Sequence, residues 1–287
     1  MSVETPRRLV DWHTHVWLPE HLGSEWGRNL DAYYATKPSE SGTYEQHRAA
    51  MDAAGVERSL VIALKSRHLG FDIPNEYVAE FVAADPERLV GFASVDPRDA
   101  NAVESLRDAV ENMGLRGVKV APPYMGFHPL SAEAWRIYAE VDRLGIPIMF
   151  HQSTVTDRSG MLSYANPILL DEVLRAYPET KVVIAHAGQP WTAEVAALMR
   201  KHRNLHTDLS GRCAKPYQLF HALRLFLEGG VIDRVAFGSD FPANTPSDDI
   251  AGLRRVNTAT YPGSPLAIPN VIIDDILYQR PLSLLGL

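Results

Sequence analysis

The sequence predicts an α/β protein in which eight parallel strands and the helices between them form a closed, slightly distorted (β/α)8 barrel, the TIM-barrel fold. Short apolar or β-branched runs occur eight times along the chain. Segments with a helical apolar period separate these runs at intervals of roughly 30 residues, which is the spacing of βα repetition. The first run ends in His-Thr-His without a glycine-rich phosphate loop, which disfavours an open dinucleotide-binding sheet.

The eight predicted strands follow one another along the whole chain. Barrel strands are expected to be apolar because their inward side chains fill a packed core. In chain order they cover residues 8–15, 58–65, 88–97, 115–123, 146–153, 181–188, 204–211 and 234–242. The runs share no residue pattern beyond apolarity, so they are not a sequence repeat.

The predicted helices lie between these strands. They cover residues 43–54, 74–85, 100–113, 131–144, 167–177, 191–202 and 215–228. Ser131 is the expected N-terminal cap of one helix, and Gly145 ends it. Two long stretches, 16–42 and 243–270, carry Pro, Gly and aromatic residues and are expected to form loops over one end of the barrel. No linker divides the chain, so residues 1–287 are expected to form a single domain.

The composition of the chain excludes several classes of protein. Of its 287 residues, 46% are hydrophobic and 22% charged, which suits one large α/β domain. The 28 Lys and Arg against 35 Asp and Glu give a net charge of -7 without a basic cluster, so nucleic acid is not an expected partner. The sequence shows neither a secretory signal nor an apolar run near the roughly 20 residues of a membrane span. We therefore expect a cytoplasmic protein that does not bind a membrane.

The use of cysteine limits the metal chemistry. Cys213 is the only cysteine in the sequence, which excludes an intrachain disulfide and a thiolate-rich zinc site. Any metal would depend on imidazole and carboxylate ligands.

Five polar residues stand toward the carboxyl ends of the predicted strands. His13 and His15 are two residues apart, which places both on the same face of the first strand. His151 ends the fifth run, His186 the sixth and Asp240 the eighth. Barrel enzymes build their active sites at this end, because the loops there can vary while the strands fix the geometry.

Four of these residues form a plausible set of metal ligands. The first and eighth strands are neighbours in a closed barrel, so Asp240 can approach His13 and His15, while His151 reaches across the axis. Three nitrogens and one oxygen suit Zn²⁺, and also Mn²⁺, Fe²⁺ or Ni²⁺. Taken singly, a His-X-His pair, a buried histidine or a strand-end aspartate is more often structural. Their common position at one end of the barrel favours a metal site.

The order of motifs resembles that of a known enzyme family over nearly the whole chain. The motifs are VDWHTHVWLPEHLG, NEYVAEFVAADPERLVGFASVDP, GLRGVKVAPPY, LGIPIMFHQS, PETKVVIAHAGQPW, NLHTDLSG and RVAFGSDFP. In this order they resemble the metal-dependent amidohydrolase superfamily, and within it the amidohydrolase 2 branch that contains aminocarboxymuconate-semialdehyde decarboxylase. The resemblance implies that His13, His15, His151 and Asp240 hold one divalent metal ion, Zn²⁺ or alternatively Mn²⁺. It also implies that His186 activates or orients the reacting water.

Arg280 and Lys119 occupy positions where members of the superfamily carry characteristic residues. Arg280 stands in the closing segment where the family usually has an asparagine, so the packing there is expected to differ. Lys119 lies on the fourth strand, where binuclear amidohydrolases carry a carboxylated lysine that bridges two metals. Because the resemblance is to the mononuclear branch, we expect Lys119 to be structural. Some lactonases of this family work without a tightly held metal.

The sequence favours a hydrolase over two alternatives. A divalent ion lowers the pKa of bound water from about 15.7 toward about 7, and Asp240 would carry the water proton to the leaving group of a lactone, amide or keto acid. His186 would orient the water or stabilise the oxyanion. The first alternative is non-oxidative decarboxylation of an aromatic or unsaturated acid at the same site. The second is a catalytically silent, ligand-binding barrel, which the intact ligand positions disfavour.

Candidate substrate-binding residues follow several strands. Arg67, Arg158 and Arg212 follow strands 2, 5 and 7 and could each anchor a carboxylate. Of the aromatic residues near strand ends, Trp17, Tyr124 and Trp191 are assigned to the pocket. The other aromatic and polar candidates are weaker: Trp12, Trp26, Tyr33, Tyr34, Phe127, Tyr164, His128 and Ser210. The expected partner is a small-molecule substrate, and relatives of this kind often form homodimers.

Overall fold

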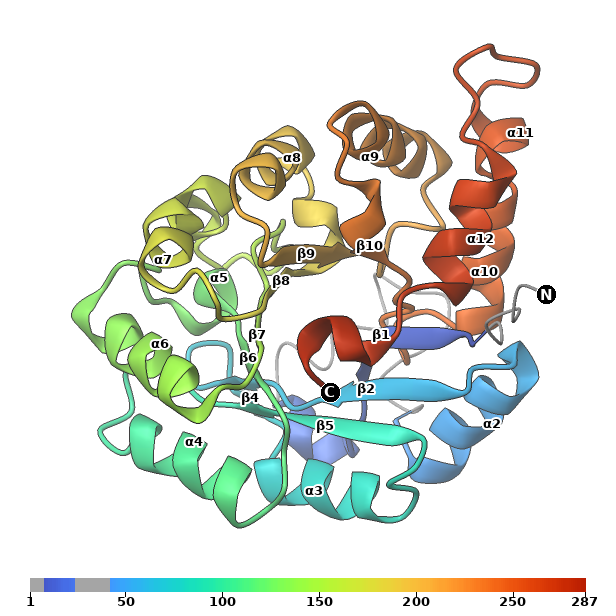
Figure 1. The fold of residues 1–287 in the computed structure, drawn as a ribbon. Coiled ribbons are helices and arrows are strands. Elements are labelled where there is room, and N and C mark those ends of the chain that lie inside the picture. Colours follow the sequence, from blue (N-terminus) through green and yellow to red (C-terminus); the bar gives the residue numbers. More distant parts are fainter. Residues whose placement is uncertain (1–7, 24–41) are drawn as a thin grey trace, which may run out of the picture.

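The computed structural model describes residues 8–23 and 42–287, in which eight parallel strands form one ring (Figure 1). Neighbours in the ring follow chain order, β1-β2-β5-β6-β7-β8-β9-β10. The strands are β1 (Val10–His15), β2 (Arg58–Ile62), β5 (Leu89–Ser94), β6 (Val118–Val120), β7 (Ile148–Phe150), β8 (Val182–Ile184), β9 (Leu205–Asp208) and β10 (Val235–Ala236). Each of them lies inside the corresponding predicted run.

The ring closes between β1 and the segment that follows β10. The Asp240 N–H donates to the His13 carbonyl at 2.8 Å, and the His15 N–H donates to the Phe241 carbonyl at 2.6 Å. A parallel bridge also joins Thr14 to Phe241. The prediction of a closed (β/α)8 barrel is therefore confirmed.

Helices surround the ring on its outer side (Figure 1). Those that match predicted segments are α2 (Tyr44–Ala54), α3 (Asn75–Ala83), α4 (Ala102–Glu111), α6 (Ala132–Leu144), α7 (Asp171–Ala176), α8 (Thr192–Lys201) and α9 (Pro216–Glu228). Shorter elements are α5 (Pro122–Met125) and the antiparallel pair β3 (Lys65–Ser66) and β4 (Phe71–Asp72). Among the helices of residues 8–23 and 42–287, none combines the length and the hydropathy of a membrane span.

The ends of α6 confirm the predicted boundary signals. The Ser131 hydroxyl accepts a hydrogen bond from the Ala134 N–H at 3.3 Å, as an N-terminal cap does. Gly145 follows the helix in the left-handed conformation, with φ of 65°, which a residue without a Cβ adopts at little cost.

The prediction of loops was wrong for much of 243–270. This stretch contains α10 (Pro246–Arg254) and α11 (Val256–Thr260), and α12 (Asn270–Tyr278) follows. The Thr245 hydroxyl caps α10 by accepting from the Asp248 N–H at 3.2 Å, and Pro246 occupies the first turn. In the other stretch, Pro19–Leu22 form a 3-10 turn. Residues 24–41, with Trp26, Tyr33 and Tyr34, lie outside the described residues.

The closing segment of the chain packs against one end of the barrel interior. Leu282 and Leu285, in a final 3-10 turn, join the buried cluster that contains Trp12. The Trp12 indole N–H donates to the Arg280 carbonyl at 2.8 Å, and the Arg280 Nε donates to the Val235 carbonyl at 3.2 Å. Figure 1 shows this segment over the centre of the ring. Arg280 thus fastens the segment to β10, which leaves the carboxyl end of the barrel for the polar residues.

An irregularity in β1 determines which of its side chains face inward. The pairing with β2 shifts register between Asp11 and Thr14, as a β-bulge does. Trp12 packs in the barrel interior, and the Thr14 hydroxyl donates to the Leu60 carbonyl at 2.7 Å. Regular alternation would direct Trp12 and His13 to opposite faces. The bulge allows Trp12 to fill the core and His13 to face the site.

Candidate metal centre

The structure brings the five predicted polar residues together at the carboxyl end of the barrel. His13 and His15 come from β1, and His151 follows β7 directly. His186 and Asp240 follow β8 and β10 in the left-handed backbone conformation, with φ of 61° and 63°. Non-glycine residues adopt this conformation rarely, and such positions cluster at functional sites.

Three donor atoms converge most closely. The Nε2 atoms of His13 and His15 are 3.2 Å apart, and Asp240 Oδ1 lies 3.5 Å from the first and 3.7 Å from the second. His15 Nδ1 lies 2.9 Å from the Ile62 carbonyl, and His13 Nδ1 lies 3.0 Å from Asp208 Oδ2. Both Nδ1 atoms therefore carry the proton, because their partners can only accept. Each Nε2 is left with an unprotonated lone pair.

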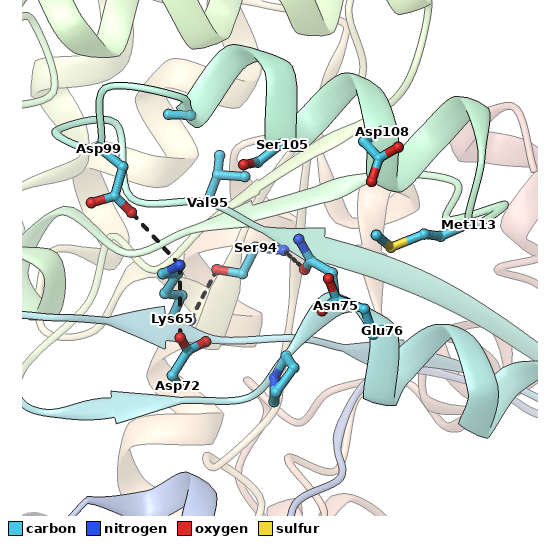
Figure 2. A pocket seen from close by; sticks show the side chains of 12 residues that line it. Lys65, Asp72, Asn75, Glu76, Ser94, Val95, Asp99, Ser105, Asp108 and Met113 are labelled. Carbon is cyan, nitrogen blue, oxygen red and sulfur yellow. Dashed lines mark hydrogen bonds and ion pairs between the residues drawn. The ribbon is translucent and has the colours of Figure 1, made fainter.

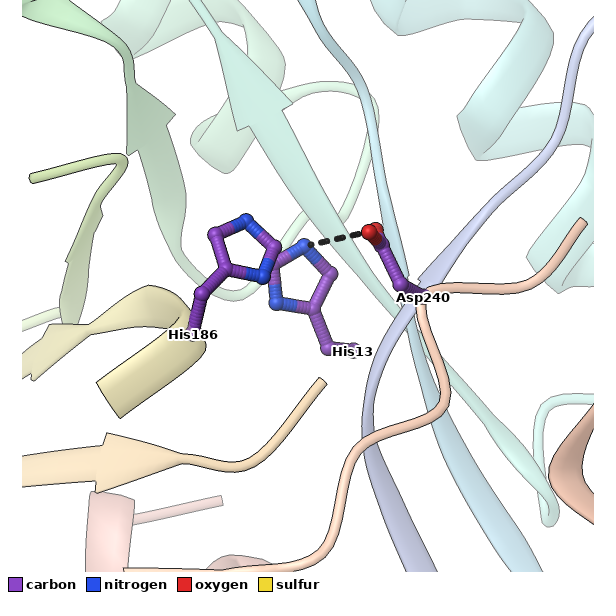
Figure 3. A group of neighbouring side chains, drawn as sticks. All are labelled: His13, His186 and Asp240. Atoms are coloured by element: carbon purple, nitrogen blue, oxygen red, sulfur yellow. Dashed lines mark ion pairs between the residues drawn. The ribbon is translucent and has the colours of Figure 1, made fainter. Parts of the chain in front are cut away.

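A second pair of imidazoles lies beside these three residues. His151 Nε2 donates to the Thr154 carbonyl at 3.1 Å, so its Nδ1 is unprotonated. This Nδ1 lies 3.1 Å from His186 Nε2. Figure 3 shows His186 close to His13 and Asp240, and one donor atom from each of these three lies within 4.8 Å of the others.

Asp208, at the end of β9, orients two of the histidines. Its Oδ2 accepts from His13 Nδ1, and its Oδ1 accepts from the His186 and Ser210 N–H groups, each at 3.0 Å. The Ser210 hydroxyl also donates to Asp208 Oδ1. Because the only hydroxyl proton goes to Asp208, His186 Nδ1 is the donor in its 2.7 Å contact with Ser210 Oγ. The Nε2 of His186 then faces the site without a proton.

Sequence reasoning missed Asp208 and placed Ser210 only among the weaker candidates. Both are fully buried. The sequence did contain a signal for Asp208, which is an acidic residue at the end of the apolar run NLHTDLSG. A carboxylate buried at the end of a strand requires polar partners.

Burial determines the protonation of the converging groups. It lowers the pKa of His15 and of His151 to about 3, and that of His13 and of His186 well below the ordinary value. Burial also raises the pKa of Asp240 to about 6, against the opposing effect of the nearby lysine. The imidazoles are thus neutral near pH 7, which is the form that binds metals.

Lys119, on β6, extends to the same place. Its Nζ lies 3.2 Å from His13 Nε2 and 3.4 Å from Met149 Sδ, and its side chain is buried. Burial lowers the pKa of Lys119 to about 8. The expectation that Lys119 is purely structural stays a prediction.

A cavity of about 650 Å³ opens above the converging side chains, a volume within the range of roughly 300–1,000 Å³ that small-molecule sites occupy. Three predicted substrate-binding residues, Trp17, Tyr124 and Arg212, line it. Trp17 stacks on His15 at 6.0 Å between ring centroids. Lys215 also lines the cavity, so part of its wall is cationic.

Other predicted substrate residues lie outside the lining of this cavity. Arg67 is 60% exposed and forms an ion pair with Asp99 at 2.9 Å. Arg158 is exposed, and Trp191 is partly buried just before α8. Arg67, Arg158 and Trp191 are therefore not part of the site that we propose below.

A smaller hollow of about 150 Å³ lies beside α3 and α4 (Figure 2). Lys65 lies 3.7 Å from a carboxylate oxygen of Asp72 and 3.7 Å from one of Asp99. The Asn75 side chain accepts from the Ser94 N–H at 2.8 Å. Several polar groups of this hollow thus interact with one another, and we assign no second site to it.

The fold and the site together define a barrel enzyme with a histidine and carboxylate centre at the carboxyl ends of its strands. A match to the family model described as Amidohydrolase covers residues 10–281. The chain therefore belongs to the amidohydrolase family, as its motifs predicted, and it is an enzyme.

A curated relative and three solved structures are similar to this chain. The relative is 2-amino-3-carboxymuconate-6-semialdehyde decarboxylase from Dictyostelium discoideum, 22% identical over 130 residues that cover 40% of this chain and 36% of that protein. The match thus spans about a third of the relative's length. An uncharacterized TIM-barrel protein from Bordetella bronchiseptica has a TM-score of 0.73 and 21% identity, over 98% of this chain and 100% of that one.

Both hydrolases and decarboxylases occur among the similar structures. A probable 2-pyrone-4,6-dicarboxylic acid hydrolase from Acinetobacter baumannii, with citric acid bound, has a TM-score of 0.70 and 20% identity, covering 98% and 100% of the two chains. A dihydroxybenzoic acid decarboxylase from Polaromonas sp. JS666, with bound manganese, has a TM-score of 0.68 and 15% identity, covering 98% and 97%. At these identities the likeness shows the shared fold.

Proposed function

We propose that this protein is a metal-dependent hydrolase of a small, anionic carbonyl compound such as a lactone, an amide or a keto acid. The observation that carries the proposal is the contact between His13 Nε2 and His15 Nε2. These two unprotonated nitrogens face each other at 3.2 Å with the Asp240 carboxylate beside them, and such a donor set attracts a cation. Asp240 Oδ1 lies 3.5 and 3.7 Å from the two nitrogens, so the three donor atoms are close enough together to bind one divalent ion.

His13, His15, His151 and Asp240 would hold the ion, with Zn²⁺ as the first candidate and Mn²⁺ as the second. Neutral imidazoles and a carboxylate suit both ions. A bound divalent cation would supply a lowered pKa for water and polarisation of a carbonyl oxygen.

The residues of the chain would move the protons and hold the substrate. Asp240, with a pKa raised to about 6, accepts the proton of the attacking water and returns it to the leaving group. His186 Nε2, unprotonated and directed at the site, orients this water by accepting a hydrogen bond. Arg212 on the cavity wall binds a carboxylate of the substrate through its planar fork.

Decarboxylation of an aromatic or unsaturated acid is the second candidate. The observation in its favour is that two aromatic residues, Trp17 and Tyr124, line the cavity next to the imidazoles. Aromatic walls suit a planar, conjugated substrate. In this reaction the site would direct a proton to a ring or alkene carbon as carbon dioxide leaves.

A panel of substrates tests the proposal and separates the two reactions. Metal-reconstituted enzyme is incubated with carboxylated lactones and with hydroxybenzoates, and the products are identified by mass spectrometry. Hydrolysis adds the mass of water, whereas decarboxylation removes that of carbon dioxide. We expect hydrolysis that Asp240→Asn abolishes. Carbon dioxide release without hydrolysis would replace the first candidate by the second, and turnover that Asp240→Asn leaves unchanged would refute both.

Three broader expectations stay predictions. They are one domain over residues 1–287, a cytoplasmic location, and a homodimer in solution.

A further inference from the structure

The position of the Lys119 side chain affects how tightly this site would bind a metal ion. Lys119 belongs to β6, three strands along the ring from β1, and its side chain extends across the interior to reach His13 Nε2 at 3.2 Å. A buried ammonium group usually has a carboxylate partner. Within residues 8–23 and 42–287, Lys119 Nζ instead contacts His13 Nε2 and the weakly accepting sulfur of Met149.

The direction of the hydrogen bond follows from the chemistry of both groups. An ammonium can only donate, and His13 Nδ1 already donates to Asp208 Oδ2. His13 Nε2 must therefore be the acceptor. Its single lone pair is the one that Lys119 uses, and it is also the one that a metal ion would need.

Charge adds to this competition. A divalent ion bound to His13 Nε2 would lie close to the ammonium of Lys119, and like charges at such a distance repel strongly in a buried site. The carboxylates of Asp240 and Asp208 attract the ammonium of Lys119 to this region. They would attract a metal ion for the same reason. Lys119 has room to move aside, because it lines the cavity of about 650 Å³.

We propose that Lys119 is a built-in competitor for the metal, which weakens metal binding by holding the lone pair of His13 in the metal-free protein. The inference rests on the proposed function, since it concerns the same metal centre. Metal entry then requires the ammonium to leave His13 and turn into the cavity. The site would accordingly bind Zn²⁺ less tightly than its donor set alone allows.

The test is a Zn²⁺ titration of metal-free protein against a chromophoric chelator at fixed pH. Lys119→Met removes the charge and the donor while keeping a long apolar side chain beside Met149. We expect Lys119→Met to bind Zn²⁺ at least about tenfold more tightly than the parent, equivalent to about 1.4 kcal/mol. Lys201→Met removes the same charge from an exposed position on α8, outside the cavity lining, and should change the affinity less than about threefold.

Two further variants, Lys119→Gln and His13→Ala, cover a folding failure of Lys119→Met and a failure of the metal centre itself. If Lys119→Met does not fold, as judged by circular dichroism, Lys119→Gln replaces it and should also bind more tightly, because the amide is a neutral and weaker donor. Unchanged or weaker binding in a folded Lys119 variant would overturn the inference. His13→Ala tests the metal centre itself: if Zn²⁺ binding survives in His13→Ala, the proposed function fails instead.

Discussion

At the scale of single residues, the site depends on groups that fix the tautomers of its histidines. Asp208 determines which nitrogen of His13 faces the site, and with Ser210 it does the same for His186. The sequence predicted the histidines because imidazoles in an apolar strand need an explanation. It did not predict Asp208, because one acid at a strand end does not reveal which ring it will contact.

Replacing Asp208 by asparagine should weaken metal binding by about 10- to 100-fold, the usual effect of losing a carboxylate partner of a ligand histidine. The neutral amide no longer fixes the Nδ1–H tautomer of His13 as firmly. A Zn²⁺ titration measures the effect, and Asp233→Asn, at a side chain that is 75% exposed, is the matched control. Equal affinities in the two variants would contradict the role assigned to Asp208.

Asp249 on α10 makes stability depend on pH. Burial, and then the neighbouring Asp11, raise the pKa of Asp249 from 3.8 to about 9. The folded state therefore holds this proton more tightly than the unfolded chain, so the free energy of unfolding falls as pH rises from about 4 to about 9. Asp249→Asn, which mimics the protonated group, should have a higher Tm than the parent at pH 8. The difference should vanish at pH 4, and a gain of equal size at both pH values would contradict this explanation.

At the scale of elements, the sequence predicted most strand and helix positions, but it did not predict the register between β1 and β2. The eight apolar runs and seven helical segments lie where predicted. The bulge in β1 could not be predicted, because a register shift depends on the partner strand and on Asp11. The Asp11 carboxylate accepts from the N–H groups of His13 and Ser239, at 3.1 and 3.0 Å. It thus links the bulge to the segment that carries Asp240.

The helix α10 was missed because its cap lies in a stretch rich in Pro and Gly. Thr245→Ala should lower the free energy of unfolding by about 1 kcal/mol, since it leaves the Asp248 N–H without its cap. Chemical denaturation followed by circular dichroism measures this change. Thr245→Ser retains the hydroxyl and should recover most of the loss, and failure of serine to do so would count against capping.

At the scale of the whole molecule, the two ends of the barrel differ in the side chains that occupy them. The closing segment covers one end with apolar side chains, and the converging polar groups occupy the other. The sequence predicted that His151, His186 and Asp240 lie together at the carboxyl end of the barrel, and the structure places them there. The role of the closing segment depends on contacts between residues far apart in the chain, such as that of Trp12 with Arg280, which a single sequence does not reveal.

Leu282 and Leu284 provide a matched test of this closure. Leu282 is 1% exposed in the barrel interior, whereas Leu284 is 36% exposed. Leu282→Ala should lower the free energy of unfolding by about 2–5 kcal/mol, because it opens a cavity in a packed core. Leu284→Ala should cost less than about 1 kcal/mol. Similar losses in urea denaturation would show that the segment does not close the barrel as described.

We propose that His13, His15, His151 and Asp240 hold one divalent metal ion. The decisive experiment is to reconstitute the protein with Zn²⁺, remove the excess, and measure the bound metal by plasma mass spectrometry. We expect about one equivalent in the parent and in His128→Ala, whose side chain lies outside the cavity lining, and almost none in folded His15→Ala and Asp240→Ala. One equivalent in all four proteins, or none in the parent, would contradict the account.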